Sequence, residues 1–224
     1  MTLPNHFLRY FLIAAILLVS GIVVIIIQTA MTNPGLVPLN PPELQARADY
    51  HKTTVMPFMA AAYPRLLFLN AGVALFILIV PLFWVWWFRR DLLDTIITLM
   101  KGTVCLLMLA LGHNSFPKLY VTCTTLSWQM AATMYLPHGG LEMIAFVLAG
   151  TSAFLCIDAL KIYLLENGNS HTLHPGDLCL FILGRIGKAG FVIFFLMAIA
   201  AAIECWLTPV LVESAFEAAL PGVA

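Results

Sequence analysis

The chain has 224 residues, of which 62% are hydrophobic and only 10% are charged. Soluble domains average about 45–50% apolar and about 25% charged residues. This composition therefore excludes a soluble enzyme, a disordered chain and a disulfide-rich secreted domain. Eleven Lys and Arg residues balance eleven Asp and Glu residues, so there is no basic excess to bind nucleic acid. We predict an all-α, polytopic integral membrane protein.

Five apolar stretches are long enough to cross a bilayer, which takes about 20 mostly apolar residues. The first is interpreted as a retained anchor, because its apolar run exceeds the roughly 7–15 residues of a signal-peptide core. The second ends in three Trp residues, which predict an aromatic belt at the lipid headgroups. The predicted spans, all in one membrane domain over residues 1–224, are about 10–29, 66–88, 95–112, 141–164 and 191–208.

Residues 119–137 are long enough for a further span but carry six Thr, Ser and Gln side chains. Lipid offers no hydrogen-bond partners to such groups. We therefore predict a re-entrant or buried polar helical segment here, and a six-span protein is the alternative.

The distribution of Lys and Arg favours five spans, because cytoplasmic loops are enriched in these residues. With a cytoplasmic N-terminus, five spans leave six cations inside and four outside, and a sixth span would move three of the six outside. The prediction is a multi-pass protein of the inner or plasma membrane with an extracytoplasmic C-terminus. The six inner cations are Arg9, Arg89, Arg90, Lys161, Arg185 and Lys188.

Two regions lie outside the predicted spans. In the outer loop, residues 30–65, Pro42 is placed to start a helix that runs through Tyr50. In the inner loop, residues 165–190, the second half has the spacing of an amphipathic helix lying on the membrane. The five Cys residues show no C-x-x-C spacing and are interpreted as small hydrophobic residues.

Two acidic residues are prominent in the predicted spans, where ionisable residues are costly and are functional hypotheses by default. Glu142 begins the fourth span and Glu204 lies near the end of the fifth, so both lie near the outer boundary. Small residues accompany both at helical spacing and let helix backbones approach closely. We expect the two acids to face a helix–helix interface. If they meet, a shared proton or cation would relieve the repulsion between them.

Two His residues lie on the same outer side. His138 precedes Glu142 by four residues, which is one helical turn, and His113 ends the third span. Two His residues with carboxylates can bind zinc. Together with Glu204 they form a candidate metal or proton site, in which Glu142 and Glu204 are the candidate catalytic groups. No cofactor is assigned, and a zinc-like divalent metal stays open. The alternative is a neutral polar network that fixes helix register.

Other polar residues are interpreted as structural. Asn70 in the second span predicts an interhelical hydrogen bond. Asp94 and Lys101 lie two helical turns apart and are expected to reach the inner surface or to pair with neighbours. A His-x-x-His-x-x-Asp string at residues 171–177 is interpreted as an ordinary loop sequence. The sequence contains no Walker-type glycine loop, no Gly-x-Ser-x-Gly and no H-E-x-x-H motif.

The motif Pro-His-Gly-Gly-Leu-Glu at residues 137–142, followed by an Ala- and Gly-rich helix, resembles the stage II sporulation protein M family. That family carries Pro-His-Gly-x-x-Glu before such a span. Ala-Ala-Ile-Glu at residues 201–204, followed by Thr208 and Pro209, is similar to the family's closing motif. Asn70 matches a position where members often have Asn. The resemblance covers roughly residues 60–212.

The resemblance implies a non-enzymatic scaffold, because the family's founding protein acts in a membrane complex with peptidoglycan-degrading proteins. The chain would recruit partners in an envelope-remodelling or export complex. The expected partners are the lipid bilayer and other membrane or envelope proteins, and homo-oligomer formation stays open. Two alternatives use His138, Glu142 and Glu204: a metal-dependent intramembrane hydrolase or peptide-processing enzyme, and a proton- or ion-coupled transporter.

Overall fold

The computed structural model describes residues 3–87, 93–116, 118–166 and 175–220. Within these residues the regular elements are all helical and there is no strand. The prediction of an all-helical chain with about five helices long and apolar enough to cross a membrane is confirmed. These five helices cover His6–Thr32, Pro41–Trp84, Thr95–Thr125, Trp128–Glu166 and Gly176–Ala219.

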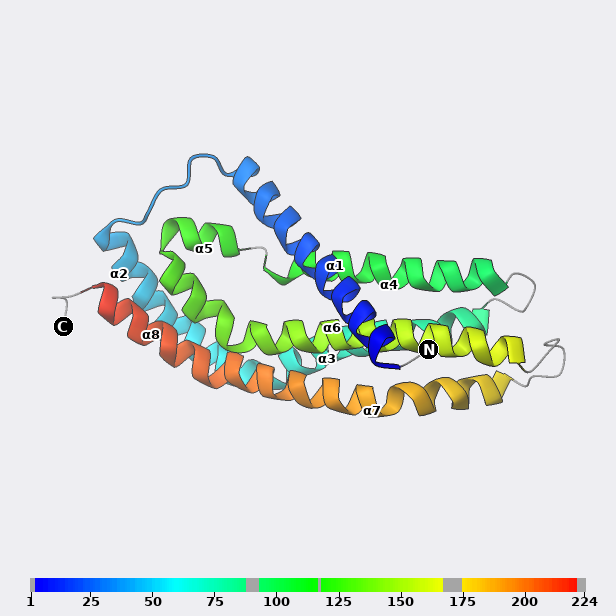
Figure 1. Ribbon diagram of the computed structural model, residues 1–224. Helices are drawn as coiled ribbons and strands as arrows, with labels where there is room; N and C mark the ends of the chain where they lie inside the picture. The colour runs from blue at the N-terminus through cyan, green and yellow to red at the C-terminus, as the bar shows by residue number, and fades with distance from the viewer. Residues whose placement is uncertain (1–2, 88–92, 117, 167–174, 221–224) are drawn as a thin grey trace.

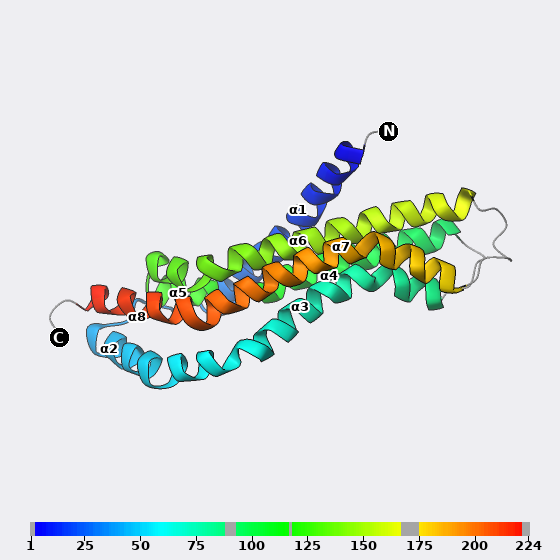
Figure 2. The same ribbon diagram turned by 90° about the horizontal axis from the view of Figure 1, so that it is seen from below.

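Two π-helical turns join their neighbours into long continuous rods, α2–η1–α3 and α7–η2–α8 (Figures 1 and 2). The two rods run side by side on one flank of α6, and α1 and α4 lie on another. The elements are α1 (Leu3–Thr32), α2 (Pro41–Tyr50), η1 (His51–Val55), α3 (Met56–Trp87), α4 (Leu93–Ser115), α5 (Leu119–Thr125), α6 (Trp128–Glu166), α7 (Pro175–Ala202), η2 (Ile203–Leu207) and α8 (Thr208–Ala219).

The helix α6 is the centre of the bundle, in contact with α1, α3, α4, α7 and α8. Its small residues Ala145, Ala149 and Ala153 are fully buried, which lets the neighbouring backbones approach closely. The helix has 39 residues and at about 1.5 Å per residue is about 58 Å long. This is nearly twice the roughly 30 Å of a bilayer's hydrocarbon core.

One end of the molecule is a helical cap, which we define as α2, η1, α5, α8 and the first turns of α6 through Pro137 (left in Figure 1). Within the cap, Met130, Val212 and Phe216 form a small hydrophobic core that is separate from the main core of the bundle. A capping box begins α2: the Asn40 side chain accepts the Glu43 N–H, and the Glu43 carboxylate accepts the Asn40 N–H. The predicted helix from Pro42 through Tyr50 is thereby confirmed.

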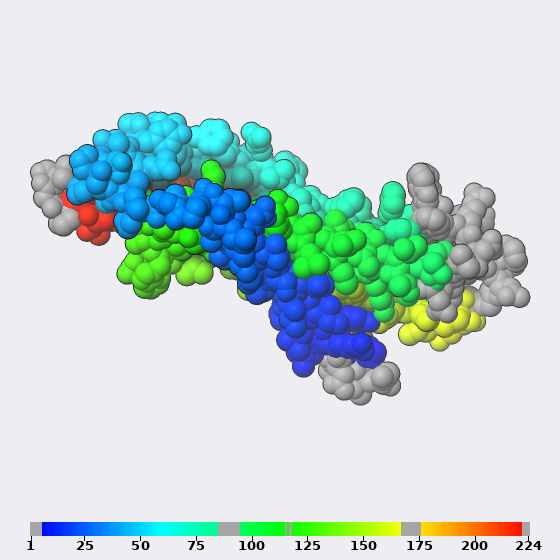
Figure 3. Space-filling view, turned by 90° about the horizontal axis from the view of Figure 1, so that it is seen from above, coloured from blue at the N-terminus to red at the C-terminus, as the bar shows by residue number. Residues whose placement is uncertain are grey.

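The helices α1 and α4 touch backbone to backbone. A Cβ atom added to Gly112 would lie 2.0 Å from the Leu18 carbonyl oxygen, and one added to Gly21 would lie 2.2 Å from that of Leu109. Only residues without a side chain fit this crossing. In Figure 3, α1 (dark blue) lies across α4 (green), and its first turns project from the bundle.

The polar segment predicted over residues 119–137 is divided in the structure. The short helix α5 ends at Thr125, and after a turn the same stretch continues as the beginning of α6. Ser127 Oγ accepts the Met130 N–H over 3.1 Å and so caps the start of α6. Met130 and Ala131 are buried, so protein covers much of this segment.

The predicted inner loop over residues 165–190 is replaced, from Pro175 onward, by the first turns of α7. Leu178, Ile182 and Ile186 recur at helical spacing and pack into the main core. The stretch is therefore amphipathic as expected, but its apolar side is used against other helices, in direct continuation of the last predicted span. The predicted outer loop, residues 30–65, is likewise helical from Pro41 onward.

Candidate functional site

Three of the sequence-predicted polar residues meet where α3, α6 and η2 pack together. Asn70 Nδ2 on α3 donates a hydrogen bond to Glu142 Oε1 on α6. Glu204, in η2, is close enough to Glu142 for the two carboxyl groups to interact electrostatically. Asn70 and Glu142, far apart in the chain, are thus in direct contact, and Glu204 lies within electrostatic range of Glu142.

A second hydrogen bond extends this group toward the cap. His138 Nδ1 on α6 and Thr208 Oγ1, at the start of α8, are hydrogen-bonded over 3.3 Å, and both residues are buried. We call Asn70, His138, Glu142, Glu204 and Thr208 the carboxyl cluster. It connects α6 to both long rods at the base of the cap.

The local helix geometry explains why the cluster forms here. The π-helical turn η2 spans Ile203–Leu207, and π turns often occur at functional sites. This turn changes the helical register between Glu204, which lies within it, and Thr208, which follows it. Ala200 and Ala201, just before it, are fully buried. The sequence motifs that resemble the sporulation family therefore supply both the polar groups and the close packing around them.

The structure gives His113 a different partner. Its Nε2 atom is hydrogen-bonded to Gln28 Oε1 of α1 over 3.0 Å. Within the described ranges, no three His, Cys, Asp or Glu side chains are grouped to hold a metal ion. The four predicted ligands therefore divide into His138, Glu142 and Glu204 in the carboxyl cluster and His113 at the α1–α4 contact.

A second polar group, absent from the predicted site, ties α6 to α1 and α4. Lys101 Nζ lies 2.5 Å from Asp158 Oδ1 and 3.1 Å from the Tyr10 hydroxyl oxygen. The Tyr10 hydroxyl also donates to Asp158 Oδ2. We call these three residues the lysine cluster. Tyr10 is buried and stacks on Phe154 with ring centroids 5.2 Å apart.

The sequence predicted that Lys101 reaches the inner surface or pairs with a neighbour; the structure shows an ion pair with Asp158, a partner that was not predicted from the sequence. A usable signal existed, because Asp158 and Lys101 each stand in an apolar stretch and carry opposite charges. The side chain of Asp94 and the whole of His171 and His174 lie outside the described residues. Asp177 is exposed in the first turn of α7, and all five Cys residues are free thiols.

The two clusters offer different chemistry. In the carboxyl cluster two acids lie within electrostatic range of each other, and within the described residues neither forms an ion pair with Lys or Arg. The other members supply an amide, an imidazole and a hydroxyl group, none of which carries a permanent positive charge. A bound proton or cation would therefore balance the charge of the second carboxylate. In the lysine cluster the charge is already balanced. Two surface hollows, one along α1 and one between α2 and α8, contain none of these residues.

Comparisons with family models, with curated proteins and with solved structures find no match. The likeness to the stage II sporulation protein M family therefore depends on the motif residues alone. Four of those residues, Asn70, His138, Glu142 and Thr208, form hydrogen bonds between helices.

Proposed function

We propose that the chain is a multi-pass scaffold of the inner or plasma membrane, similar to stage II sporulation protein M, that recruits envelope proteins through its cap. One observation carries the proposal. The carboxyl cluster holds two hydrogen bonds between helices, Asn70 to Glu142 and His138 to Thr208, which link α6 to α3 and to α8 in an interface of small residues. Such a network holds helices in one register, and it holds the cap on the bundle.

The lengths of the helices support a cap outside the bilayer. Tyr63 stacks on Trp206 with ring centroids 4.9 Å apart, and aromatic residues favour the headgroup region. Trp84 lies 21 positions beyond Tyr63 on the same helix, which corresponds to about 32 Å. This matches a hydrocarbon core of about 30 Å. Residues 41–62, 119–137 and 208–219 then project beyond the membrane.

The orientation follows from the cations. The end of α6 and the first half of α7 carry three of the six predicted inner cations, Lys161, Arg185 and Lys188, and these segments lie at the end opposite the cap (right in Figure 1). Because positive charge favours the cytoplasmic side, the cap and the C-terminus are extracytoplasmic and the N-terminus is cytoplasmic. In this arrangement the polar segment 119–137 is covered by protein in the cap.

The proposal is tested by breaking the network without touching the cap surface. Asn70→Leu removes the amide that bonds Glu142 and leaves a carboxyl group without its partner, at a cost of about 1–3 kcal/mol. We expect lower thermal stability in detergent and fewer cross-linked complexes with envelope proteins in native membranes. Asn114→Leu, at an exposed site on α4, is the matched control. Equal cross-linking by both variants and the wild type would contradict the scaffold proposal.

A second candidate, a proton- or ion-coupled transporter, is favoured by the adjacency of Glu142 and Glu204. Carboxyl groups inside membrane bundles serve as proton or cation carriers in pumps and transporters. Purified protein in liposomes would then show ion flux that Glu204→Gln abolishes and that Glu166→Gln, at the exposed end of α6, leaves intact. No flux in any of the three proteins would rule this candidate out. The hydrolase alternative has no comparable support, since His113 bonds Gln28.

A further inference from the structure

We propose that the hollow between α2 and α8 is a docking site for a Lys or Arg side chain of an extracytoplasmic protein. This inference depends on the proposed function, because it names the chemistry by which the cap would recognise its partner. It uses residues that play no part in the carboxyl cluster or the lysine cluster.

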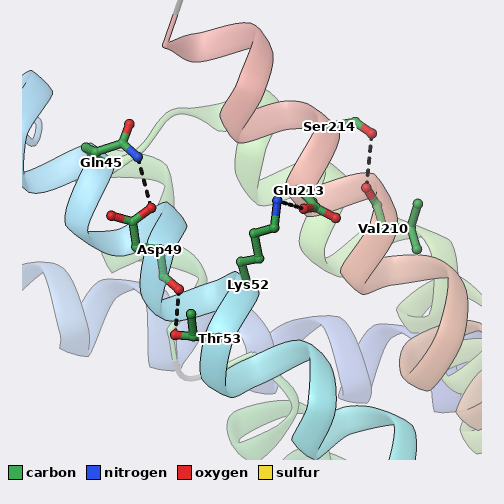
Figure 4. Close-up of polar contacts among 7 residues, drawn as sticks. All are labelled: Gln45, Asp49, Lys52, Thr53, Val210, Glu213 and Ser214. Atoms are coloured by element: carbon green, nitrogen blue, oxygen red, sulfur yellow. Dashed lines mark hydrogen bonds and ion pairs between the residues drawn. The ribbon is translucent and has the colours of Figure 1, made fainter. Parts of the chain in front are cut away.

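The hollow lies on the outermost part of the cap, where α2 and α8 run side by side (Figure 4). Its volume is about 470 Å³, which is enough for one long side chain and its neighbours. Its walls combine acidic, amide and apolar groups. The lining residues are Gln45, Ala48, Asp49, Lys52, Glu213, Phe216, Glu217 and Leu220.

The charge of the lining selects a cation. Three carboxylates, those of Asp49, Glu213 and Glu217, line the hollow together with a single ammonium group, that of Lys52. Lys52 Nζ lies 3.2 Å from Glu213 Oε1, and Asp49 Oδ1 accepts a hydrogen bond of 2.9 Å from Gln45 Nε2. The ion pair demonstrates that an ammonium group fits against this rim. The remaining negative charge attracts a second cation and repels an anionic lipid headgroup or an acidic peptide.

The apolar part of the hollow suits the stem of such a side chain. Ala48 and Leu220 line it together with Phe216, which belongs to the core of the cap and is nearly fully buried. Lys and Arg bury their methylene stems on apolar surface while the charged end bonds to acids. A purely apolar segment would instead cover three carboxylates of which only Glu213 has a cation, that of Lys52, and burying the uncompensated charge would be costly.

A buried polar atom in the same interface has no partner. His51 precedes Lys52, is 8% exposed, and packs its ring 5.9 Å from that of Phe216. Its Nδ1 atom is buried and forms no hydrogen bond with any described residue. Buried polar atoms are nearly always hydrogen-bonded in native proteins. The contact between η1 and α8 thus retains unused hydrogen-bonding capacity, although His51 is not among the residues that line the hollow.

The test uses the full-length protein in nanodiscs of zwitterionic phosphatidylcholine. The probe is the peptide Lys-Lys-Leu-Lys-Lys with a photoreactive group, and its Glu counterpart is the charge control. The double variant Asp49→Asn with Glu217→Gln should bind the Lys peptide about tenfold more weakly than the wild type. A matched double variant, Glu166→Gln with Asp177→Asn, removes the same charge from exposed residues at the far end and should bind as the wild type does.

One further variant is expected to bind the Lys peptide more tightly than the wild type, a result that a folding defect would not produce. Lys52→Ala removes the ammonium group that occupies Glu213 and should bind the Lys peptide several-fold more tightly. Photo-cross-links should fall within residues 41–55 and 208–220. Equal binding by the two double variants, weaker binding by Lys52→Ala, or cross-links elsewhere on the protein would overturn the proposal.

The outcomes also separate this inference from the scaffold proposal. If the peptide does not bind but Asn70→Leu still loses its cross-linked complexes, the scaffold proposal stands and the hollow is not its docking site. If the peptide binds as expected but the complexes do not depend on Asn70, the hollow is a cation-binding site and the proposed scaffold fails.

Discussion

The two polar clusters of the bundle lie on opposite faces of α6 and are built on different principles. Glu142 and Asp158 are 16 positions apart, which places them roughly 24 Å apart along the helix and roughly 160° apart around it. Glu142 bonds to an amide on α3 and has a second carboxyl group beside it. Asp158 bonds to an ammonium group on α4 and a phenol on α1.

The two clusters therefore differ in whether their charges are paired. The lysine cluster is a closed ring of three hydrogen-bonding residues with its charges paired. The carboxyl cluster has hydrogen bonds but no cation among the described residues. We therefore expect the lysine cluster to stabilise the α1–α4–α6 packing. The carboxyl cluster retains chemical capacity, which the transporter candidate would use.

The largest effect is expected from Gly112→Ala, at the contact between α4 and α1, the two helices that the lysine cluster ties to α6. The new methyl group would lie 2.0 Å from a backbone oxygen of α1, and no rotamer change can relieve that contact. Overpacking costs about 1–3 kcal/mol where side chains can adjust, and we expect about 3 kcal/mol or more here. Thermal unfolding in detergent measures it.

Gly102→Ala is the matched control for this substitution on the same helix. A Cβ atom at Gly102 meets nothing within 4 Å, so the change should leave stability unaltered or raise it by up to about 1 kcal/mol. If the two variants unfolded at the same temperature, α1 would not be packed against α4 as described.

Asp158→Asn should have the next largest effect. It leaves Lys101, which is one-third exposed, without its carboxylate, and we expect a loss of about 1–3 kcal/mol. Tyr10→Phe removes only one hydrogen-bonding group of the ring and should cost about 1 kcal/mol. The same unfolding measurement ranks them, and a larger loss in Tyr10→Phe would show that the ion pair contributes little.

Thr208→Val is the corresponding change on the other face. It removes the hydroxyl group that bonds His138 and preserves the shape of the side chain, so a loss of about 1 kcal/mol is expected. Protease digestion from the cap side should also become faster, because this bond connects α6 to the start of α8. Unchanged digestion with unchanged stability would mean that the cap is held by its apolar core alone.

Glu142→Gln should have the smallest effect, and with Asp158→Asn it forms the sharpest comparison. Both exchange a carboxylate for an amide of the same shape. At position 142 the Asn70 amide can still donate to the new oxygen and the repulsion from Glu204 disappears, so stability should change by less than about 0.5 kcal/mol. Unfolding temperatures that fall equally in the two variants would erase the proposed difference between the clusters.

Much of the candidate site could be predicted because its acidic residues stand in otherwise apolar stretches of sequence. Glu142 follows a Pro-His-Gly-Gly sequence and Glu204 follows a run of Ala, so each acid stands out in an apolar helix. Asp158 was not among the predicted site residues, because the sequence shows no local partner pattern that marks it. Its actual partner, Lys101, is 57 positions away. His113 was predicted in the site, but its tertiary partner is on α1.

The sequence by itself determined the helical class and the number of membrane-spanning candidates, because hydrocarbon requires every backbone group to be bonded within its own helix. It also determined the α2 start, since a capping box is a local contact. Only the tertiary structure decided that residues 119–137 divide between α5 and α6, that residues 175–190 join α7, and that Lys101 meets Asp158. These features depend on which helix faces pack together, and helical periodicity in one segment carries no information about the partner of each face.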